Sequence, residues 1–380
     1  MSWFWALFLP ALLLAAAGLR GERRRARFYR EALASADRQT WLPPVTLIVP
    51  VKGPEEGLRE NLASLAAQDY PDYELIVTAR TAEDIPEGVL PPGARVVLAG
   101  EPDGNTSEKI QNLLAGIQAS RRQSQVLAFA DSDGQVSRSW LRALVGPLVD
   151  PGVGASTGYR WYLPQPADFW SLLRSVWNAV IAGRFGPEQC DFAWGGAMAI
   201  RRDVFERCRV RDFWQGAVSD DYRLSEAVRR AGFRIQFTPA ALVVSPGRTT
   251  AREFWSWTRR QLLITRFYCP RLWWLALGSH AVYCAANVAC VIKAFSGGLL
   301  GEYGLVVLWG LGMAKGAHRA ALARQALPEW SAWFQRHEWV HAWWTPLATW
   351  AWLISLAASA FSDKMEWRGR TYRLSRCAAP

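Results

Sequence analysis

The sequence has only six cysteines among its 380 residues, and no two of them form a C-x-x-C pair. Such spacing is not that of structural zinc sites or thiol oxidoreductases. We therefore expect reduced, mostly buried thiols in a cytoplasmic domain. Internal repeats, low-complexity tracts and recognisable RNA- or DNA-binding motifs are also lacking, which argues against repeat proteins and nucleic-acid-binding proteins.

Acidic residues are in the minority, with 33 Asp and Glu against 44 Lys and Arg, giving a net charge of +11. The basic residues cluster close to apolar segments, and tryptophan is abundant at 22 residues. Tryptophan is enriched at bilayer interfaces, and basic residues are attracted to an anionic cytoplasmic leaflet. We expect a membrane partner and no nucleic-acid partner.

An uncharged apolar run over residues 3–19 is followed, not preceded, by six arginines between positions 20 and 30. A secretory signal has the opposite charge order, although 15–17 resembles a cleavage site. We expect an uncleaved transmembrane anchor over 1–20 and a basic juxtamembrane linker over 21–42. The positive-inside bias places the following domain in the cytoplasm.

A second membrane region is expected over 272–361, followed by a basic tail over 362–380. Its candidate spans are 272–295, the Gly-rich and therefore marginal 299–314, and the uncharged 342–361. The aromatic segment 328–341 predicts a helix in the interface. If the N-terminal anchor and all three candidate spans crossed the bilayer, the basic tail would lie on the non-cytoplasmic side, against the positive-inside bias. One of the C-terminal segments is therefore expected to be re-entrant or interfacial.

Between these regions, apolar strands alternate with amphipathic helices. Strands are predicted over 45–51, 73–78, 94–98, 126–129 and 153–162, and helices over 54–68 and 107–119. This alternation predicts a domain over 43–271 of the α/β class, with a doubly wound sheet.

Asp131 and Asp133 directly follow the buried strand 126–129. Open α/β sheets bind ligands at the carboxyl ends of their strands, and paired carboxylates suit Mg²⁺ or Mn²⁺ bridging phosphates. The alternative is an ordinary turn in which Asp133 or Ser137 caps a helix that begins near Trp140.

Six segments in order resemble a family 2-type nucleotide-sugar glycosyltransferase with a GT-A fold. The chain is most similar to the ceramide glucosyltransferase-like (family 21-like) branch. The matching segments are 45–52, 64–71, 107–113, 131–133, 194–199 and 219–222, and the likeness runs from about 45 to 271. It implies an integral membrane hexosyltransferase, expected in the plasma membrane, that moves glucose from a UDP-sugar to a lipid hydroxyl such as that of ceramide, with inversion.

The resemblance also implies roles for individual residues. Asp131 and Asp133 would hold the metal, and Asp221 would be the general base, with Asp220 tuning it or capping a helix. The donor-binding set is Lys109, Asn112, Asp84, Asp131 and Arg260. The acceptor side is Trp194, Gly195, Gly196, Trp257 and Gln261.

Two family features are altered. No clean counterpart exists for the aspartate that recognises the uracil base, so Glu83 or Asp84 would substitute for it. The Q/R-x-x-R-W motif is broken: aligning Arg260 with its arginine puts Trp257 at the Gln/Arg position and Gln261 at the Trp position. The acceptor is therefore left open, and another UDP-sugar transferase or a polysaccharide synthase is the alternative. A membrane scaffold with a decayed transferase domain is a third possibility.

His337, Glu338 and His341 form a literal H-E-x-x-H, the zinc motif of membrane metalloproteases. The chain has only two other histidines, and no clear carboxylate partner follows. The aromatic surroundings favour interfacial anchoring instead, so a zinc protease is kept as the minor alternative.

Overall fold

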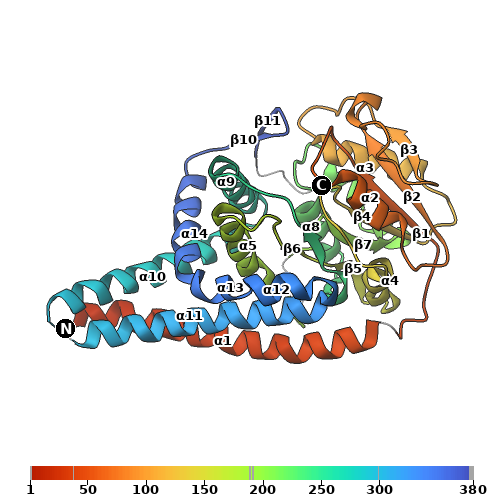
Figure 1. Cartoon of the computed structure of the whole chain (residues 1–380). Coiled ribbons are helices and arrows are strands. Elements are labelled where there is room, and N and C mark those ends of the chain that lie inside the picture. Colours follow the sequence, from red (N-terminus) through yellow and green to blue (C-terminus); the bar gives the residue numbers. More distant parts are fainter. Residues whose placement is uncertain (1, 37, 188–189, 191, 298, 376–380) are drawn as a thin grey trace. The chain divides into compact units, whose positions relative to one another are not determined.

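The computed structural model describes residues 2–36, 38–187, 190, 192–297 and 299–375 (Figure 1). They fall into two compact units. The sheet unit holds the described residues of 28–161, 184–247 and 370–375, and the helical unit holds those of 2–27, 162–183 and 248–369. The predicted domain over 43–271 is thus divided, since 162–183 and 248–271 group with the helical unit.

The sheet unit is built on seven strands, most of them parallel to their neighbours. In spatial order they are β3 (Arg95–Leu98), β2 (Tyr73–Ala79), β1 (Val45–Pro50), β4 (Val126–Ala130), β7 (Ala197–Arg201), β5 (Val153–Thr157) and β8 (Arg234–Phe237). β7 runs antiparallel to β4 and β5. The chain moves outward from β1 through β2 to β3 and then returns to β4 on the other side of β1. This reversal is a topological switch point, where such sheets bind ligands.

The predicted doubly wound α/β sheet is confirmed. Every residue of β4 is buried, as its unbroken apolar sequence predicts for a strand covered on both faces. The helices of this unit are α2 (Leu58–Ala66), α3 (Glu108–Ala119), α4 (Trp140–Val145), α6 (Arg202–Arg207), α7 (Val210–Trp214) and α8 (Asp220–Arg230). Its short 3₁₀ turns are η1 (Ala82–Asp84), η2 (Gly146–Val149) and η3 (Pro239–Ala241).

The segment 153–162 does not form the single strand that its sequence predicts. It divides at Gly158 into β5 and β6 (Arg160–Tyr162), and β6 pairs with β9 (Val243–Ser245) outside the main sheet. A Cβ at Gly158 would lie 1.9 Å from the carbonyl oxygen of Ala241, so only glycine permits this backbone approach. The division carries Arg160 out of the main sheet.

The helical unit contains α5 (Phe169–Ala182), α9 (Ala251–Tyr268), α10 (Pro270–Phe295), α11 (Leu299–Ala326), α12 (Ser331–His337), α13 (Trp339–Trp343) and α14 (Thr345–Ser359). It also holds η4 (Pro328–Trp330) and β10 (Lys364–Trp367). α1 (Ser2–Ala36) begins in this unit and continues past Arg27 into the sheet unit. The basic segment predicted as a linker is therefore largely helical.

Within the described residues, two helices are long and apolar enough to cross a membrane, α1 and α10. Only 22% and 28% of the residues in their apolar windows are buried, unlike the core helix of a water-soluble protein. The apolar run 342–361 instead yields the 15-residue α14. At about 1.5 Å per residue it is shorter than a hydrocarbon core of about 30 Å.

Small residues let the apolar helices pack closely. α1 contributes Phe4, Phe8 and Ala11 to a cluster with Ala286 and Cys290 of α10 and with Leu308 of α11. A Cβ at Gly301 of α11 would lie 2.3 Å from the carbonyl oxygen of Cys290. Glycine at such positions allows helix backbones to approach one another.

Candidate functional site

Asp131 and Asp133 lie in the loop after β4, at the switch point of the sheet. Hydrogen bonds fix the backbone of this loop from two sides. Asn61 Nδ2 donates to the Ser132 carbonyl at 2.9 Å, and Ser245 Oγ donates to the Asp133 carbonyl at 2.9 Å. The loop therefore holds its carboxylates in place before any ligand binds.

The capping alternative for this loop is wrong. α4 begins at Trp140, and its N-cap residue is Ser139, with no side-chain cap. Asp133 instead forms a two-bond ion pair with the guanidinium of Arg160, including a bond of 2.7 Å to Oδ2. The same guanidinium lies 3.2 Å from Asp131 Oδ2.

Sequence reasoning missed Arg160. Its signal is a charged residue between Tyr159 and Trp161 in an otherwise uncharged predicted strand, a pattern that indicates a partner of opposite charge. Its guanidinium also lies over the ring of Trp194, 4.9 Å from the ring centroid.

The donor set at Asp131 and Asp133 fits a divalent cation. Both carboxylates reach one positive group, so their oxygens converge on a single cation position. The described residues contain no group of three or more His, Cys, Asp or Glu that could hold a metal alone. Mg²⁺ and Mn²⁺ accept few protein carboxylates when phosphate oxygens complete the ligand set, which matches this pair.

Lys109 of α3 lies behind Asp131 and joins it to a second acidic position. Its Nζ is 2.8 Å from Asp131 Oδ1, 3.2 Å from Asp220 Oδ2 and 3.4 Å from the Gly195 carbonyl oxygen. Three predicted regions, 107–113, 131–133 and 219–222, are thereby brought together. The ammonium of Lys109 neutralises the carboxylates of Asp131 and Asp220, and its predicted role at the diphosphate stays a prediction.

Burial and these contacts shift the pKa values of Lys109, Asp220 and Asp221. Burial alone lowers the pKa of Lys109, but the neighbouring carboxylates of Asp131 and Asp220 outweigh it and raise that pKa above its ordinary value. Burial raises the pKa of Asp220 to about 6, although Lys109 opposes the shift. Burial also raises the pKa of Asp221, against its hydrogen bond from Ser219.

Asp220 and Asp221 begin α8 and differ in their contacts. Ser219, not Asp220, is the N-cap, and its Oγ accepts the Tyr222 N–H at 3.1 Å. Asp221 Oδ1 accepts bonds from Ser219 Oγ and from the Tyr222 N–H, which tie it to the helix terminus. Asp220 contacts Lys109 instead, so the capping alternative for Asp220 is wrong.

Gly195 and Gly196 lie against the carboxylates. A Cβ at Gly195 would be 2.4 Å from Asp220 Oδ2 and 2.9 Å from Lys109 Nζ. A Cβ at Gly196 would be 2.6 Å from Asp131 Oδ2. The two glycines, predicted for the acceptor side, thus also pack against the acidic cluster, where a side chain would leave no room for the carboxylates.

Asn112, the other predicted residue of α3, is buried one turn after Lys109. Its Oδ1 has no hydrogen-bond partner among the described residues. A buried amide oxygen without a partner is costly, so this atom is available to a ligand.

The ends of β1 and β2 carry a second charged cluster. Lys52 Nζ lies 2.7 Å from Glu108 Oε2, and Arg80 pairs with Glu101 at 2.6 Å. Asp84, a predicted donor-binding residue, accepts a hydrogen bond from the Thr81 N–H and lies 3.5 Å from Arg80. Glu83 is exposed beside it. Arg80 thus occupies the region in which a base-recognising carboxylate was expected.

The C-terminal strand β11 (Arg370–Arg373) supplies further contacts that the sequence did not indicate. Arg370 pairs with Glu101 and lies 3.2 Å from Glu108 Oε2. Tyr372 Oη accepts the backbone N–H of Glu108 at 3.4 Å. The C-terminal segment therefore supports the first turn of α3, which carries Lys109.

Trp257, Arg260 and Gln261 lie on α9 in the helical unit. Trp257 packs edge-on against Trp177, with ring centroids 5.0 Å apart, and Arg260 lies over the ring of Trp367. Their predicted roles in substrate binding remain predictions.

The H-E-x-x-H segment is not a metal site in the part of the chain that the structure describes. His341 is buried, and its Nε2 lies 3.3 Å from Ser175 Oγ. Glu338 pairs with Arg324 at 2.8 Å, and His337 packs against the ring of Trp333. The break between α12 and α13 explains why the motif lacks the geometry of one continuous helix. Four of the five described cysteines are buried thiols and Cys269 is partly buried, as predicted, while Cys377 lies outside the described residues.

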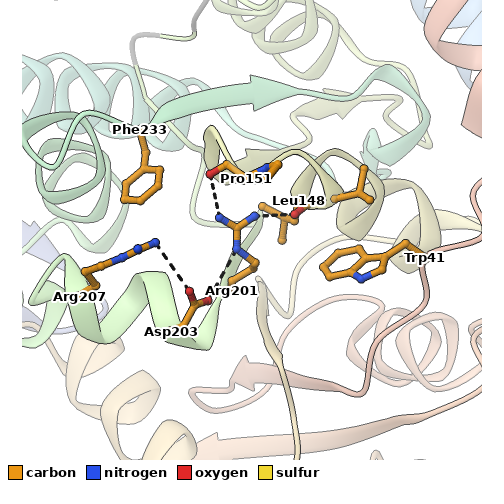
Figure 2. Close-up of a pocket in the computed structure, with 8 residues that line it drawn as sticks. Trp41, Leu148, Pro151, Arg201, Asp203, Arg207 and Phe233 are labelled. Carbon is orange, nitrogen blue, oxygen red and sulfur yellow. Dashed lines mark hydrogen bonds and ion pairs between the residues drawn. The ribbon is translucent and has the colours of Figure 1, made fainter.

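A cavity of about 450 Å³ is lined in part by Arg201. Arg201 pairs with Val126, the first residue of β4, so this cavity lies at the end of β4 opposite to Asp131. Figure 2 shows the Arg201 guanidinium directed at the carbonyls of Leu148 and Pro151, with Asp203 beside it. Arg201 is thus used for structural hydrogen bonds. This cavity is separate from the carboxylate cluster.

Comparison with known proteins agrees with this fold. The model of glycosyl transferase family 21 matches residues 3–378. Among solved structures, a mannosyltransferase from Pyrobaculum calidifontis in complex with GDP-Man and Mn²⁺ is 19% identical, with a TM-score of 0.51, over 93% of this chain and 98% of that one. GalNAc-T7 with UDP, GalNAc and Mn²⁺ is 13% identical, with a TM-score of 0.41, over 60% and 49%. The mannosyltransferase supports the GT-A fold.

Proposed function

Because the chain belongs to glycosyl transferase family 21, we propose that it moves a sugar from a UDP-sugar to a lipid hydroxyl. Glucose is the proposed sugar, and ceramide or a related lipid is the proposed acceptor. The observation that carries this proposal is the convergence of Asp131 and Asp133 on one cation position at the switch point of a GT-A sheet.

The acidic cluster suits an inverting transfer. A bound Mg²⁺ or Mn²⁺, held by Asp131 and Asp133, would neutralise the leaving diphosphate. Asp221 would take the proton from the acceptor hydroxyl. The hydroxyl oxygen would bond to the anomeric carbon of the sugar as the bond between that carbon and the diphosphate oxygen breaks. Asp220 and Lys109 would keep the charges around this step balanced. A single displacement inverts the anomeric configuration.

Membrane attachment through α1 and α10 fits a lipid acceptor. We place the sheet unit on the cytoplasmic side of the plasma membrane, because arginines follow the apolar part of α1 and none precedes it. The bilayer would then deliver the acceptor hydroxyl, and the cytoplasm would deliver the nucleotide sugar. Asn112 and Asp84 would contribute to donor binding, with Trp194, Gly195 and Gly196 beside the acceptor.

The test is direct. Membranes containing the full chain are given radiolabelled UDP-glucose and a lipid extract, and labelled glycolipid is separated by thin-layer chromatography. Asp131→Ala and Asp221→Asn should each abolish the product. Asp203 is an exposed aspartate that lines the cavity near Arg201, away from the carboxylate cluster, and Asp203→Ala should leave product formation intact. Unchanged product from both site variants would overturn the mechanism.

Donor and acceptor class are read in the same assay. Parallel reactions with UDP-galactose, UDP-N-acetylglucosamine and GDP-mannose establish the sugar. A labelled polymer that stays at the origin, instead of a mobile glycolipid, would favour the polysaccharide synthase. The rates of product formation by Asp220→Asn and Asp221→Asn are also compared, and the base is the residue whose replacement causes the larger loss of rate.

A further inference from the structure

Arg160 occupies the position on which the carboxylates of Asp131 and Asp133 converge. Its guanidinium bonds both oxygens of Asp133 and one oxygen of Asp131. The Arg160 side chain is 10% exposed and stacks on Trp194, whereas the side chains of Asp131 and Asp133 are 26% and 37% exposed. The ion pair is therefore shielded from water on the Arg160 side and open to it on the carboxylate side. Bidentate guanidinium–carboxylate pairs are among the stronger hydrogen-bonded contacts in proteins.

The charges around Arg160 explain why a cation is needed there. Lys109 neutralises the inner face of Asp131 and cannot serve Asp133 as well, because its other partner is Asp220. Without a positive group on the outer face, two adjacent carboxylates would repel each other. Arg160 supplies that charge from a different strand.

We propose that Arg160 is an internal counter-cation that holds the Asp131–Asp133 pair in its metal-binding geometry and competes with the divalent cation for it. When the cation and a nucleoside diphosphate bind together, Arg160 gives up the carboxylates and contacts the diphosphate oxygens from its place over Trp194. This proposal rests on the proposed function and names a positioning residue for its donor site.

Two consequences follow for binding. The divalent cation alone must break the Arg160 ion pairs without compensation, so it binds weakly. With the diphosphate present, Arg160 exchanges one anionic partner for another, so the cost disappears. Cation and diphosphate therefore strengthen each other's binding, and by linkage the factor is the same in both directions.

The experiment measures Mn²⁺ binding to the full-length protein in detergent micelles, from the loss of the free Mn²⁺ signal in electron paramagnetic resonance. Titrations are run with and without UDP, and no turnover is required. Arg160→Gln should bind Mn²⁺ alone about tenfold to a hundredfold more tightly than the parent, the equivalent of removing one charge-assisted contact. It should also lose most of the enhancement by UDP.

Arg160→Lys should fall between the two, because a single ammonium nitrogen cannot reproduce the two-bond contact that the guanidinium makes with Asp133. The matched control is Arg202→Gln. Arg202 is a partly buried arginine of the sheet unit, and it bonds the Ser124 carbonyl at 2.7 Å, away from the cluster. Its Mn²⁺ affinity should equal that of the parent.

Thermal unfolding provides a second readout. Without metal, Arg160→Gln should melt below the parent, and Mn²⁺ should raise its melting temperature more than it raises that of the parent. Unchanged or weaker Mn²⁺ binding by Arg160→Gln, or an undiminished effect of UDP, would overturn the proposal. If Mn²⁺ behaves as expected but no UDP-sugar is used by the parent, only the proposed function fails.

Discussion

The ammonium group of Lys109 lies 3.2 Å from a carboxylate oxygen of Asp220, and the same group is 2.8 Å from Asp131. One buried lysine thus connects the acidic loop after β4 with the start of α8. Both ends of this connection were predicted as functional, but the connection itself was not.

Replacing Lys109 with Met should abolish transfer and destabilise the protein. The substitution leaves the buried carboxylate of Asp220 without its counter-charge, whereas Asp131 keeps Arg160. Removing one partner of a buried ion pair costs about 3–5 kcal/mol. Adding Asp220→Asn to Lys109→Met should restore part of the melting temperature without restoring activity. Additive losses in this double-mutant cycle would show that the two groups are not coupled.

Gly195→Ala should reduce activity strongly while the protein still folds. The added methyl group would lie 2.4 Å from Asp220 Oδ2, so the carboxylate or the lysine beside it must move. Steady-state transfer rates and circular dichroism measure the two effects separately. Gly247→Ala is the control, because its methyl group would meet the Glu56 side chain at an ordinary 3.5 Å.

Transfer should weaken in acid. Burial raises the pKa of Asp220 to about 6, so its carboxyl group is charged at pH 7 and gains a proton as the pH falls below about 6. Protonation removes its ion pair with Lys109, and kcat/KM should decline with it. A pH profile of Asp220→Asn should lack this step. A parent profile that stays flat down to pH 5 would contradict the assignment.

His341 should make the helical unit sensitive to acid. Burial lowers its pKa to about 3, whereas an unfolded histidine gains its proton near pH 6.5. The unfolded state therefore binds the proton first, and stability is lost as the pH falls from about 6.5 towards 3, by about 2 kcal/mol at pH 5. His341→Gln should show a smaller fall in melting temperature between pH 7 and 5. His318→Gln, at an exposed position of α11, should behave as the parent does.

Arg370→Ala should destabilise the start of α3 by about 1 kcal/mol, since its partner Glu108 is buried and its partner Glu101 is exposed. Because Lys109 follows Glu108, donor KM should rise several-fold as well. Arg122→Ala, an exposed arginine just beyond the other end of α3, is the matched control for both measurements. Equal effects from both variants would exclude a specific role for the C-terminal strand.

The sheet and much of the acidic cluster could be predicted from the sequence because both depend on local patterns. β4 is an unbroken apolar strand, and its carboxylates follow at once. Ser107 is recognisable as a helix cap, which places Lys109 on the first turn of its helix. The cap of the next acidic helix was assigned to Asp220, one residue after the actual cap Ser219. The family resemblance then ordered these segments correctly.

Arg160 and Arg370 could not be found in the same way. Arg160 reaches the acidic loop only because the chain leaves the main sheet at Gly158, and Arg370 lies 262 positions after Glu108 in the sequence. Such pairings depend on tertiary approach, which hydrophobic periodicity does not encode. The length of α14 was likewise overestimated because apolar composition does not reveal that Trp344 separates it from α13.

The continuity of α1 has a mechanical consequence. Its 35 residues extend about 50 Å at 1.5 Å per residue, while a hydrocarbon core is about 30 Å thick. If α1 crosses the bilayer as we propose, about 20 Å of the same rod lies outside it, with no proline after Pro10 to act as a hinge. A thinner bilayer tilts such a helix, and the tilt displaces the part of α1 that lies outside the membrane. Lipid thickness would thus act directly on the orientation of the chain where it leaves the membrane.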